Sequence, residues 1–167
     1  MRVRVTLLLA LVLAVSGCSM LPGAKREQSP KQLTVLEFLD AGRPKAALVV
    51  ANELVTEAPD DYQSYLTRNA VYLVLQDYTQ AQVDNAKALE KFEASKDRYP
   101  EKERNYRLAK IHESFALTAL IASRRAQDPE DRKQLEAFFV KHVQMVKELD
   151  EDTWKNMQGL TGEPAGK

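Results

Sequence analysis

Apolar residues recur at intervals of three and four along most of this chain, which is the spacing of helices that bury one face. In the stretch 101–125, Leu108, Ile111 and Phe115 fall on one helical face, and neighbouring apolar residues widen it. No glycine or proline interrupts that stretch after Pro100. The pattern predicts an all-α fold.

A second long helix is indicated by "QDPEDRKQL", where Asp128 is suited to cap the helix and Pro129 to stand in its first turn. One apolar stripe then runs to the end of this helix; it consists of Leu135, Phe138, Phe139, His142, Val146 and Leu149. We expect the pair covering 101–149 to form a long hairpin.

The first half of the chain contains an internal repeat of 34 residues, seen when 28–61 is aligned with 62–95. Equivalent positions carry similar residues: Phe38 and Tyr72, Leu39 and Leu73, Ala47 and Ala81, Val55 and Leu89. The repeat predicts two units of the same helical design, in which the small alanines allow paired helices to cross closely.

The turns of the repeat carry their own signals. Gly42 can end a helix in the left-handed conformation, and Pro44 is suited to open the next one. "LDAGRPKAALVVANELVTEAP" resembles the second half of a tetratricopeptide repeat (TPR), with Gly42 and Pro59 in the family's positions. "LQDYTQA" resembles the same turn, with Gln76 where the family prefers glycine. The resemblance implies TPR-like antiparallel helical hairpins, stacked as a short right-handed solenoid of about six helices.

The N-terminal segment has the pattern of a secretory signal: Arg2 and Arg4, then an apolar stretch at 5–15 that is too short to span a bilayer. "VSGC", ending at Cys18, resembles the bacterial lipobox. That resemblance implies removal of residues 1–17 and attachment of lipid, including palmitate, to Cys18. The alternative, an unmodified cysteine, leaves its position unexplained, because a lone cysteine cannot form an internal disulfide.

The residue after the cysteine is Ser19, whereas an aspartate there would retain a lipoprotein of this class at the inner membrane. We therefore expect an outer-membrane lipoprotein that faces the periplasm of a Gram-negative cell. Residues 18–31 are interpreted as the lipidated cysteine and a flexible tether, 32–150 as a TPR-like helical domain, and 151–167 as a mostly disordered extension.

Charge excludes one class of partner. The 167 residues carry 24 basic and 24 acidic side chains, and removal of the two arginines of the signal leaves 22 against 24. This balance provides no net positive charge for nucleic-acid binding.

Catalytic patterns are absent from the sequence. The two histidines, His112 and His142, do not have zinc-binding spacing, and His142 lies on an apolar stripe that favours a core position. No GxSxG stretch or phosphate-binding glycine loop is present. We expect a protein that is not an enzyme and uses no cofactor or metal.

A binding surface remains, since TPR-like proteins use the inner face of their first helices as a groove for a peptide. The candidate partner-binding residues are Leu36, Leu39, Asp40, Gln63, Leu66, Ala70, Leu73 and, near the C-terminus, Trp154. The alternative is that Leu39, Leu66 and Leu73 bury into the core and that Trp154 covers the end of the helices. Thr67 stands where a carboxylate-clamping groove would have asparagine, which argues against that clamp.

The sequence thus predicts a non-catalytic, lipid-anchored periplasmic adaptor or assembly (pilotin-like) factor that recruits a component of a secretion, pilus or envelope machine. Its expected partner is an envelope protein, and its lipid binds the membrane. The alternative is a lipoprotein that activates or positions a peptidoglycan synthase or hydrolase.

Overall fold

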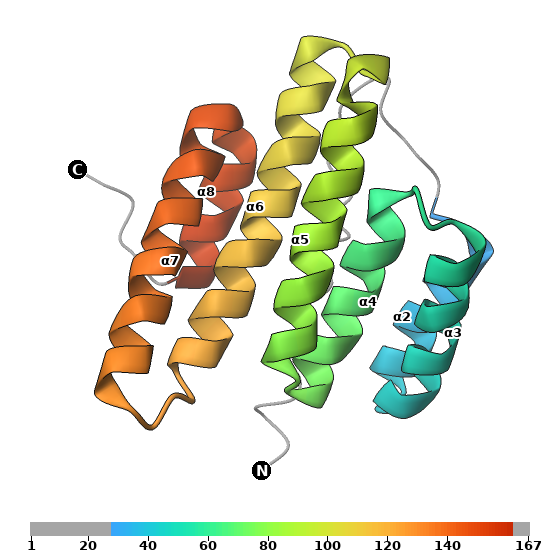
Figure 1. Cartoon of the computed structure of the whole chain (residues 1–167), viewed down its shortest axis with the longest axis horizontal. Coiled ribbons are helices and arrows are strands. Elements are labelled where there is room, and N and C mark those ends of the chain that lie inside the picture. The colour runs from blue at the N-terminus through green and yellow to red at the C-terminus, as the bar shows by residue number, and fades with distance from the viewer. Residues whose placement is uncertain (1–27, 162–167) are drawn as a thin grey trace. The chain divides into compact units, whose positions relative to one another are not determined.

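The computed structural model describes residues 28–161, and every regular element in that range is helical (Figure 1). The predicted all-α fold class is confirmed. The α-helices are α2 (Pro30–Asp40), α3 (Pro44–Glu57), α4 (Tyr62–Leu75), α5 (Tyr78–Ser95), α6 (Glu101–Ser123), α7 (Pro129–Leu149) and α8 (Glu151–Thr161), with one 3-10 turn at Lys96–Arg98.

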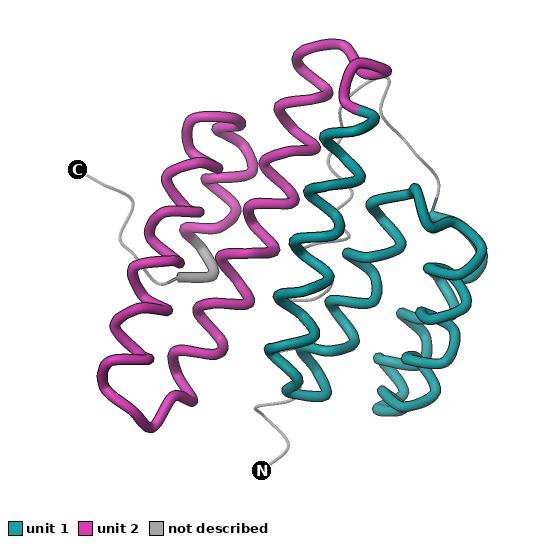
Figure 2. The backbone as a smooth tube through the Cα atoms, viewed as in Figure 1, with its two compact units in different colours: residues 1–95 teal, residues 96–167 magenta. Residues whose placement is uncertain are grey.

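The helices divide into two compact units, as Figure 2 shows. The first unit contains α2 to α5 and ends at Ser95; the second begins at Lys96 and contains α6 to α8. In the first unit α2 pairs with α3 and α4 pairs with α5, so the 34-residue repeat corresponds to two helical hairpins. In the second unit α6 pairs with α7, as the pattern of 101–149 predicts.

The turn between α2 and α3 depends on a left-handed residue. Gly42 has a φ of 67°, a conformation that L side chains adopt only at a cost. Its N–H donates to the carbonyl of Leu39 at 3.0 Å, and the N–H of Arg43 donates to the carbonyl of Phe38 at 2.8 Å. This pair of bonds satisfies the last carbonyls of α2 and reverses the chain into Pro44, the first residue of α3.

The turn between α4 and α5 has the same geometry without a glycine. Gln76 has a φ of 66°, and its N–H donates to the carbonyl of Leu73 at 3.1 Å. The N–H of Asp77 donates to the carbonyl of Tyr72 at 2.9 Å. These two hydrogen bonds are the equivalents, 34 residues later, of the two bonds around Gly42. Glutamine in place of glycine therefore leaves the geometry of the turn unchanged, but it raises the conformational energy of the backbone at this position.

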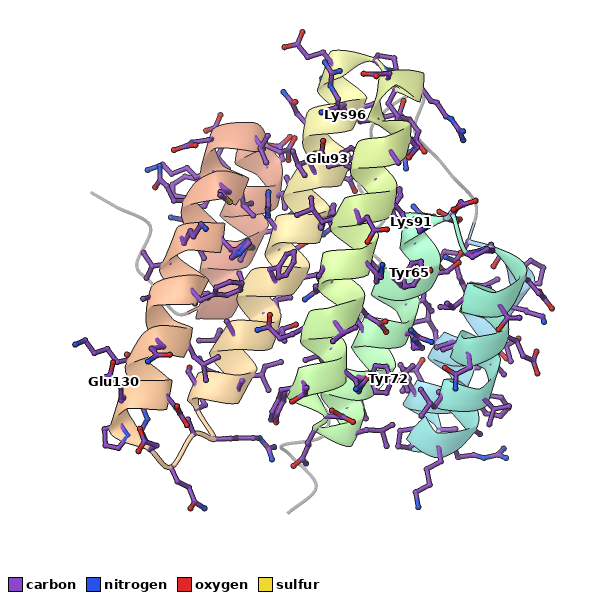
Figure 3. The ribbon with its side chains drawn as sticks, in the orientation of Figure 1. Tyr65, Tyr72, Lys91, Glu93, Lys96 and Glu130 are labelled. Carbon is purple, nitrogen blue, oxygen red and sulfur yellow. The ribbon has the colours of Figure 1, made fainter. Side chains whose placement is uncertain are left out.

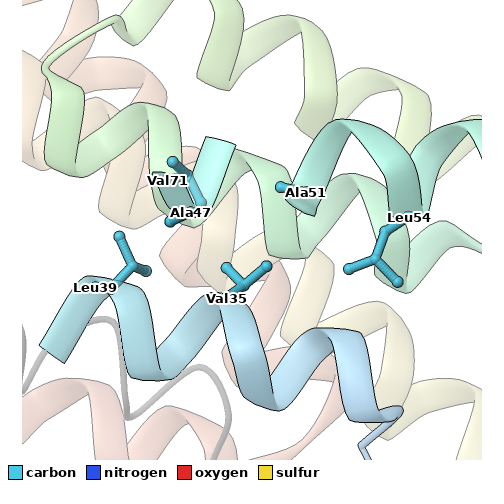
Figure 4. Packing of buried hydrophobic residues seen from close by; sticks show 6 residues of the cluster. All are labelled: Val35, Leu39, Ala47, Ala51, Leu54 and Val71. Carbon is cyan, nitrogen blue, oxygen red and sulfur yellow. The ribbon is translucent and has the colours of Figure 1, made fainter. Parts of the chain in front are cut away.

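A core cluster fills the space between the first three helices of the first unit (Figure 4). Ala47 and Ala51 are fully buried on α3, and their small side chains let α2 approach closely. Ala81, the repeat equivalent of Ala47, is also fully buried on α5. The cluster consists of Val35, Leu39, Ala47, Ala51, Leu54 and Val71.

The C-terminal segment differs from the prediction. Residues 151–161 form α8 instead of a mostly disordered extension, so residues 28–161 hold seven α-helices and not about six. Asp150 accepts a hydrogen bond from the N–H of Thr153 at 2.8 Å and thereby caps the new helix. Thr153 and Met157, four residues apart, are buried against α6 and α7, and this burial is what orders the segment.

Candidate functional site

Two of the predicted groove residues belong to the core of the first unit. Leu39 is 2% exposed and Leu73 is 5% exposed, and Leu39 contributes to the cluster of Figure 4. The alternative from the sequence, burial, therefore holds for these two leucines. Neither side chain presents enough surface to bind a partner.

The other predicted groove residues keep part of their surface open. Leu36, Gln63 and Leu66 are half-buried, and Asp40 at the end of α2 is exposed. Ala70 is also half-buried, but it packs against the core cluster. The structure thus separates the predicted set into an accessible part and a part used for packing.

Trp154 lies on α8 in the second unit and is half-buried against a cluster of Ala109, Ala116, Val146 and Met157. The ammonium of Lys147 lies 4.7 Å from the centre of its ring. Trp154 thus packs on helices of its own unit, as in the alternative that it covers the end of the helices. The other predicted site residue, Cys18, lies outside the described residues.

A pocket of about 550 Å³ opens where the N-terminal ends of α2 and α4 meet the C-terminal end of α3. We call it the first-unit pocket. Of the predicted residues, it includes Gln63 and none of the apolar ones. Its lining consists of Ser29, Pro30, Lys31, Gln32, Leu54, Glu57, Ala58, Asp61, Gln63 and Ser64.

The two helix starts beside the pocket are capped by their own side chains. Ser29 accepts from the N–H of Gln32 at 3.3 Å, and the Gln32 amide oxygen accepts from the N–H of Ser29 at 2.8 Å, which is a capping box. Asp61 accepts from the N–H of Gln63 at 3.2 Å at the start of α4. The Gln32 amide also donates to Thr67 at 3.4 Å, and this bond joins α2 to α4 next to the pocket.

One wall of the pocket carries an ion-pair cluster. The ammonium of Lys31 donates to Glu57 at 2.6 Å and to Glu53 at 2.9 Å, which links the start of α2 to the end of α3. Both hydrogen bonds raise the pKa of Lys31 above its usual value, and the bond to Glu57 has the larger effect. All three side chains reach solvent, and ion pairs at the surface add little to the stability of a fold. The cluster therefore matters more for the charge of the pocket than for the stability of the first unit.

The helix α4, which lines the pocket with Gln63 and Ser64, is held in place by a network around Arg68. Arg68 donates to both carboxylate oxygens of Asp84, at 2.8 and 2.7 Å, and to the amide oxygen of Asn52 at 3.1 Å. Asp84 is 1% exposed, and its hydrogen bonds raise the pKa of Arg68. Tyr65 and Tyr72, labelled in Figure 3, place their rings 5.9 and 5.8 Å from the guanidinium. The network links α3, α4 and α5 and fixes the rotation of α4.

Both histidines lie in the second unit and face one another across the α6–α7 hairpin. The Nδ1 atoms of His112 and His142 are 3.0 Å apart, and His142 stacks on Phe115 at 4.6 Å between ring centres. The pKa of His142 is lowered to about 4, mainly because the ring is buried and to a smaller extent because His112 is close. The sequence placed His142 in the core but missed this pairing, because the two residues are 30 positions apart and only the hairpin register aligns them.

Among residues 28–161 no group of three or more histidine, cysteine, aspartate or glutamate side chains is placed to hold a metal ion. No helix in that range combines the length and the apolar character needed to cross a membrane. The first-unit pocket, formed where three helix ends meet, is the candidate site among the described residues.

Comparison of the chain with protein-family models, with characterised proteins and with solved structures finds no match. The resemblances to tetratricopeptide repeats and to the lipobox accordingly stay predictions from the sequence.

Proposed function

We propose that this chain is a non-catalytic, lipid-anchored adaptor of the periplasm that recruits an envelope protein through the first helices of its N-terminal unit. The observation that carries the proposal is the first-unit pocket between α2 and α4, the first helices of the two repeated hairpins. A pocket that combines apolar floor and polar rim is typical of a binding site.

The anchor supports the same proposal. The lipobox-like "VSGC" ends at Cys18, and the described helices begin with Pro30, so few residues separate the proposed lipid from the pocket. About 12 residues reach at most roughly 40 Å when fully extended. A pocket so close to the membrane fits a factor that acts on a component of an outer-membrane machine, such as a secretion or pilus assembly.

The anchor is tested by replacing Cys18 with alanine in cells fed a palmitate analogue. We expect the wild type to be labelled and recovered with the outer membrane, and Cys18→Ala to be unlabelled and to keep its signal segment uncleaved. Serine at the same position, Cys18→Ser, is the matched control for size, and it should also remain unlabelled. Equal labelling of all three proteins would contradict the lipid anchor.

The recruiting surface is tested by photo-crosslinking in intact envelopes. A benzophenone amino acid replaces Gln63, which lines the pocket, and in a second variant replaces Val83, a 49% exposed residue on α5 that does not line it. We expect one dominant adduct from position 63 and none from position 83, with the crosslinked protein identified as part of an envelope machine. An adduct with a peptidoglycan synthase or hydrolase would replace this proposal with the regulatory alternative.

A further inference from the structure

We propose that the α6–α7 hairpin carries a second recruiting surface, which α8 covers in this structure and which an amphipathic helix of a partner protein can take in its place. The surface consists of Ala109 and Ala116 of α6 and Val146 of α7, which are fully buried in one cluster with Met157 of α8. We call it the α8 docking face. The inference goes beyond the proposed function, because it concerns the second unit and makes access for a partner depend on α8.

The docking face has the composition of a helix contact. Ala109 and Ala116 lie seven residues apart, which is two turns along one face of α6. Small side chains at such a contact let another helix approach closely. The partly buried apolar residues that pack against this cluster are Phe139, Val143, Leu149 and Trp154. The face therefore suits a helix with large apolar side chains, and α8 is such a helix.

α8 binds the docking face with one side only. Thr153 is 3% exposed and Met157, one turn later, is 1% exposed. Trp154 lies beside them, and the ammonium of Lys147 on α7 is 4.7 Å from the centre of its ring. The exposed side of α8 carries Glu151, Asp152, Lys155 and Asn156. This is the arrangement by which an amphipathic helix is recognised in a protein groove.

The sequence of α8 makes it a weak helix by itself. Its 11 residues are fewer than the roughly 12–15 that an isolated helix needs in water. Thr153 is β-branched and Gly159 stands in the last turn, and both residues lower helix propensity. Asp150 alone joins α8 to α7, in an extended conformation. The helical state of α8 therefore depends on docking, and the segment can leave while α6 and α7 stay paired.

The occupant that replaces α8 is a stronger amphipathic helix of a partner. The covalent link gives α8 an effective concentration in the millimolar range, which a competitor has to overcome. The α8 of a second copy would gain no contact by exchange, since it has the same sequence. A partner helix gains over α8 where it has an apolar residue in place of Thr153 and a good helix former in place of Gly159. An aromatic residue three positions before a methionine or leucine would keep the contact with Lys147.

The test uses synthetic peptides, so that it does not depend on knowing the partner. The first peptide copies residues 150–161. The second, the strong peptide, carries Thr153→Leu and Gly159→Ala, and it should bind the docking face at least about tenfold more tightly than the copy. The third is the strong peptide with Met157→Asp added, which places a charge in the apolar contact and should not bind.

Displacement of α8 is followed in the full-length protein. The ¹⁵N-labelled protein is held in detergent micelles, and the unlabelled peptides do not contribute signals. We expect the strong peptide to move the amide signals of Thr153 and Met157 to the positions of an unfolded segment. The signals of Ala109 and Val146 should keep folded positions, because the peptide fills the docking face again. The third peptide should leave all four signals unchanged at the same concentration.

A variant of the protein removes the competition by α8. Met157→Asp places a charge at a position that is 1% exposed, so α8 should leave the docking face. The copy peptide should bind this variant at least about tenfold more tightly than the wild type. The matched control is Asn156→Asp, the next position on the exposed side of α8, which should bind the copy like the wild type. If Met157→Asp does not fold, displacement by the strong peptide in the wild type decides alone.

Three outcomes would overturn the inference. The first is a set of α8 signals that stays folded in the presence of the strong peptide. The second is equal binding of the copy peptide to Met157→Asp and to Asn156→Asp. The third is a concentration-dependent doubling of mass in analytical ultracentrifugation that Met157→Asp abolishes, which would assign the face to a second copy. Crosslinking from position 63 concerns the first-unit pocket, so the proposed function and this inference are tested separately.

Discussion

The two units of this chain place their polar groups differently. Among the described residues of the first unit, the buried charged side chain is Asp84, which lies beneath Arg68, whereas Lys31, Glu57 and Asp61 line the pocket. In the second unit His112, Glu113 and His142 are all buried within or beside the α6–α7 hairpin. The first unit thus combines an apolar core with polar residues around its pocket, whereas the second unit has titratable side chains inside its core.

Glu113 illustrates the cost of the second arrangement. It is 1% exposed and pairs with Lys110 one turn earlier on α6. Burial raises the pKa of its carboxyl, and the charge and hydrogen bond of Lys110 lower it by less. A buried ion pair of this kind gives weak net stability, but removal of one partner alone leaves an uncompensated charge. The comparison predicts that the second unit responds to pH and that the first responds to packing changes.

The largest effect is expected from overpacking the repeat. Ala81→Trp places a large ring at a fully buried position of α5, which should destabilise the protein by about 3 kcal/mol or more. Ala86→Trp is the matched control, because Ala86 is exposed on the same helix and its change should stay within about 0.5 kcal/mol. Urea unfolding followed by far-UV circular dichroism measures both. Similar stabilities for the two variants would contradict close helix crossing at Ala81.

An intermediate effect is expected from acidification of the second unit. The pKa of His142 is about 4 in the folded protein and about 6.5 when unfolded, so its contribution to stability is complete above pH 6.5 and is lost as the pH falls towards 4. After screening by solvent, the loss amounts to about 2 kcal/mol. Trp154, the single tryptophan of the chain, reports on this unit by fluorescence during urea unfolding at each pH.

The control for this prediction is His142→Phe, which keeps a ring against Phe115 but cannot titrate. The variant should lose less stability than the wild type between pH 6.5 and pH 4. Glu113 acts in the opposite direction, since its raised pKa gives stability that is present at low pH and lost as the pH rises. It is present in both proteins, so the difference between them isolates His142. Parallel pH profiles would contradict a buried neutral histidine at this position.

The smallest effect tests whether the two turns of the repeat are equivalent. Gly42→Ala should destabilise the first unit by about 1 kcal/mol, because nothing lies within 4 Å of the added Cβ and the backbone conformation supplies the whole cost. Gln76→Gly should stabilise it by about 0.5 kcal/mol for the same reason. Thermal melts of the two variants beside the wild type give opposite shifts if the turns are equivalent. Shifts of the same sign would break the equivalence.

Local signals account for what the sequence predicted well. The bounds of α3 and α7 follow from Pro44 and from Asp128 with Pro129, residues that act through their own backbone or through bonds to the next turn. The resemblance of "LQDYTQA" to the turn at Gly42 predicted that Gly42 and Gln76 would turn the chain in the same way. Such features need no knowledge of distant residues, because each involves groups within about five positions of one another.

Burial of individual side chains could not be read from one sequence. Leu39 and Leu66 both lie on apolar faces of first helices, yet Leu39 enters the core and Leu66 keeps part of its surface open. The difference depends on which helices pack on either side of each residue. The same reason applies to α8, whose helical state depends on burial of Met157 against α6 and α7.

By itself the sequence determined the helical class of the protein, the repeat of its first half and the residues that begin and end its helices, because these depend on local spacing and backbone preference. Only the tertiary structure decided that Glu57 at the end of α3 would share a pocket with Ser64 of α4, and that His112 would meet His142. Those groups are brought together from separate helices, and their contacts are set by the packing of apolar faces elsewhere in each unit.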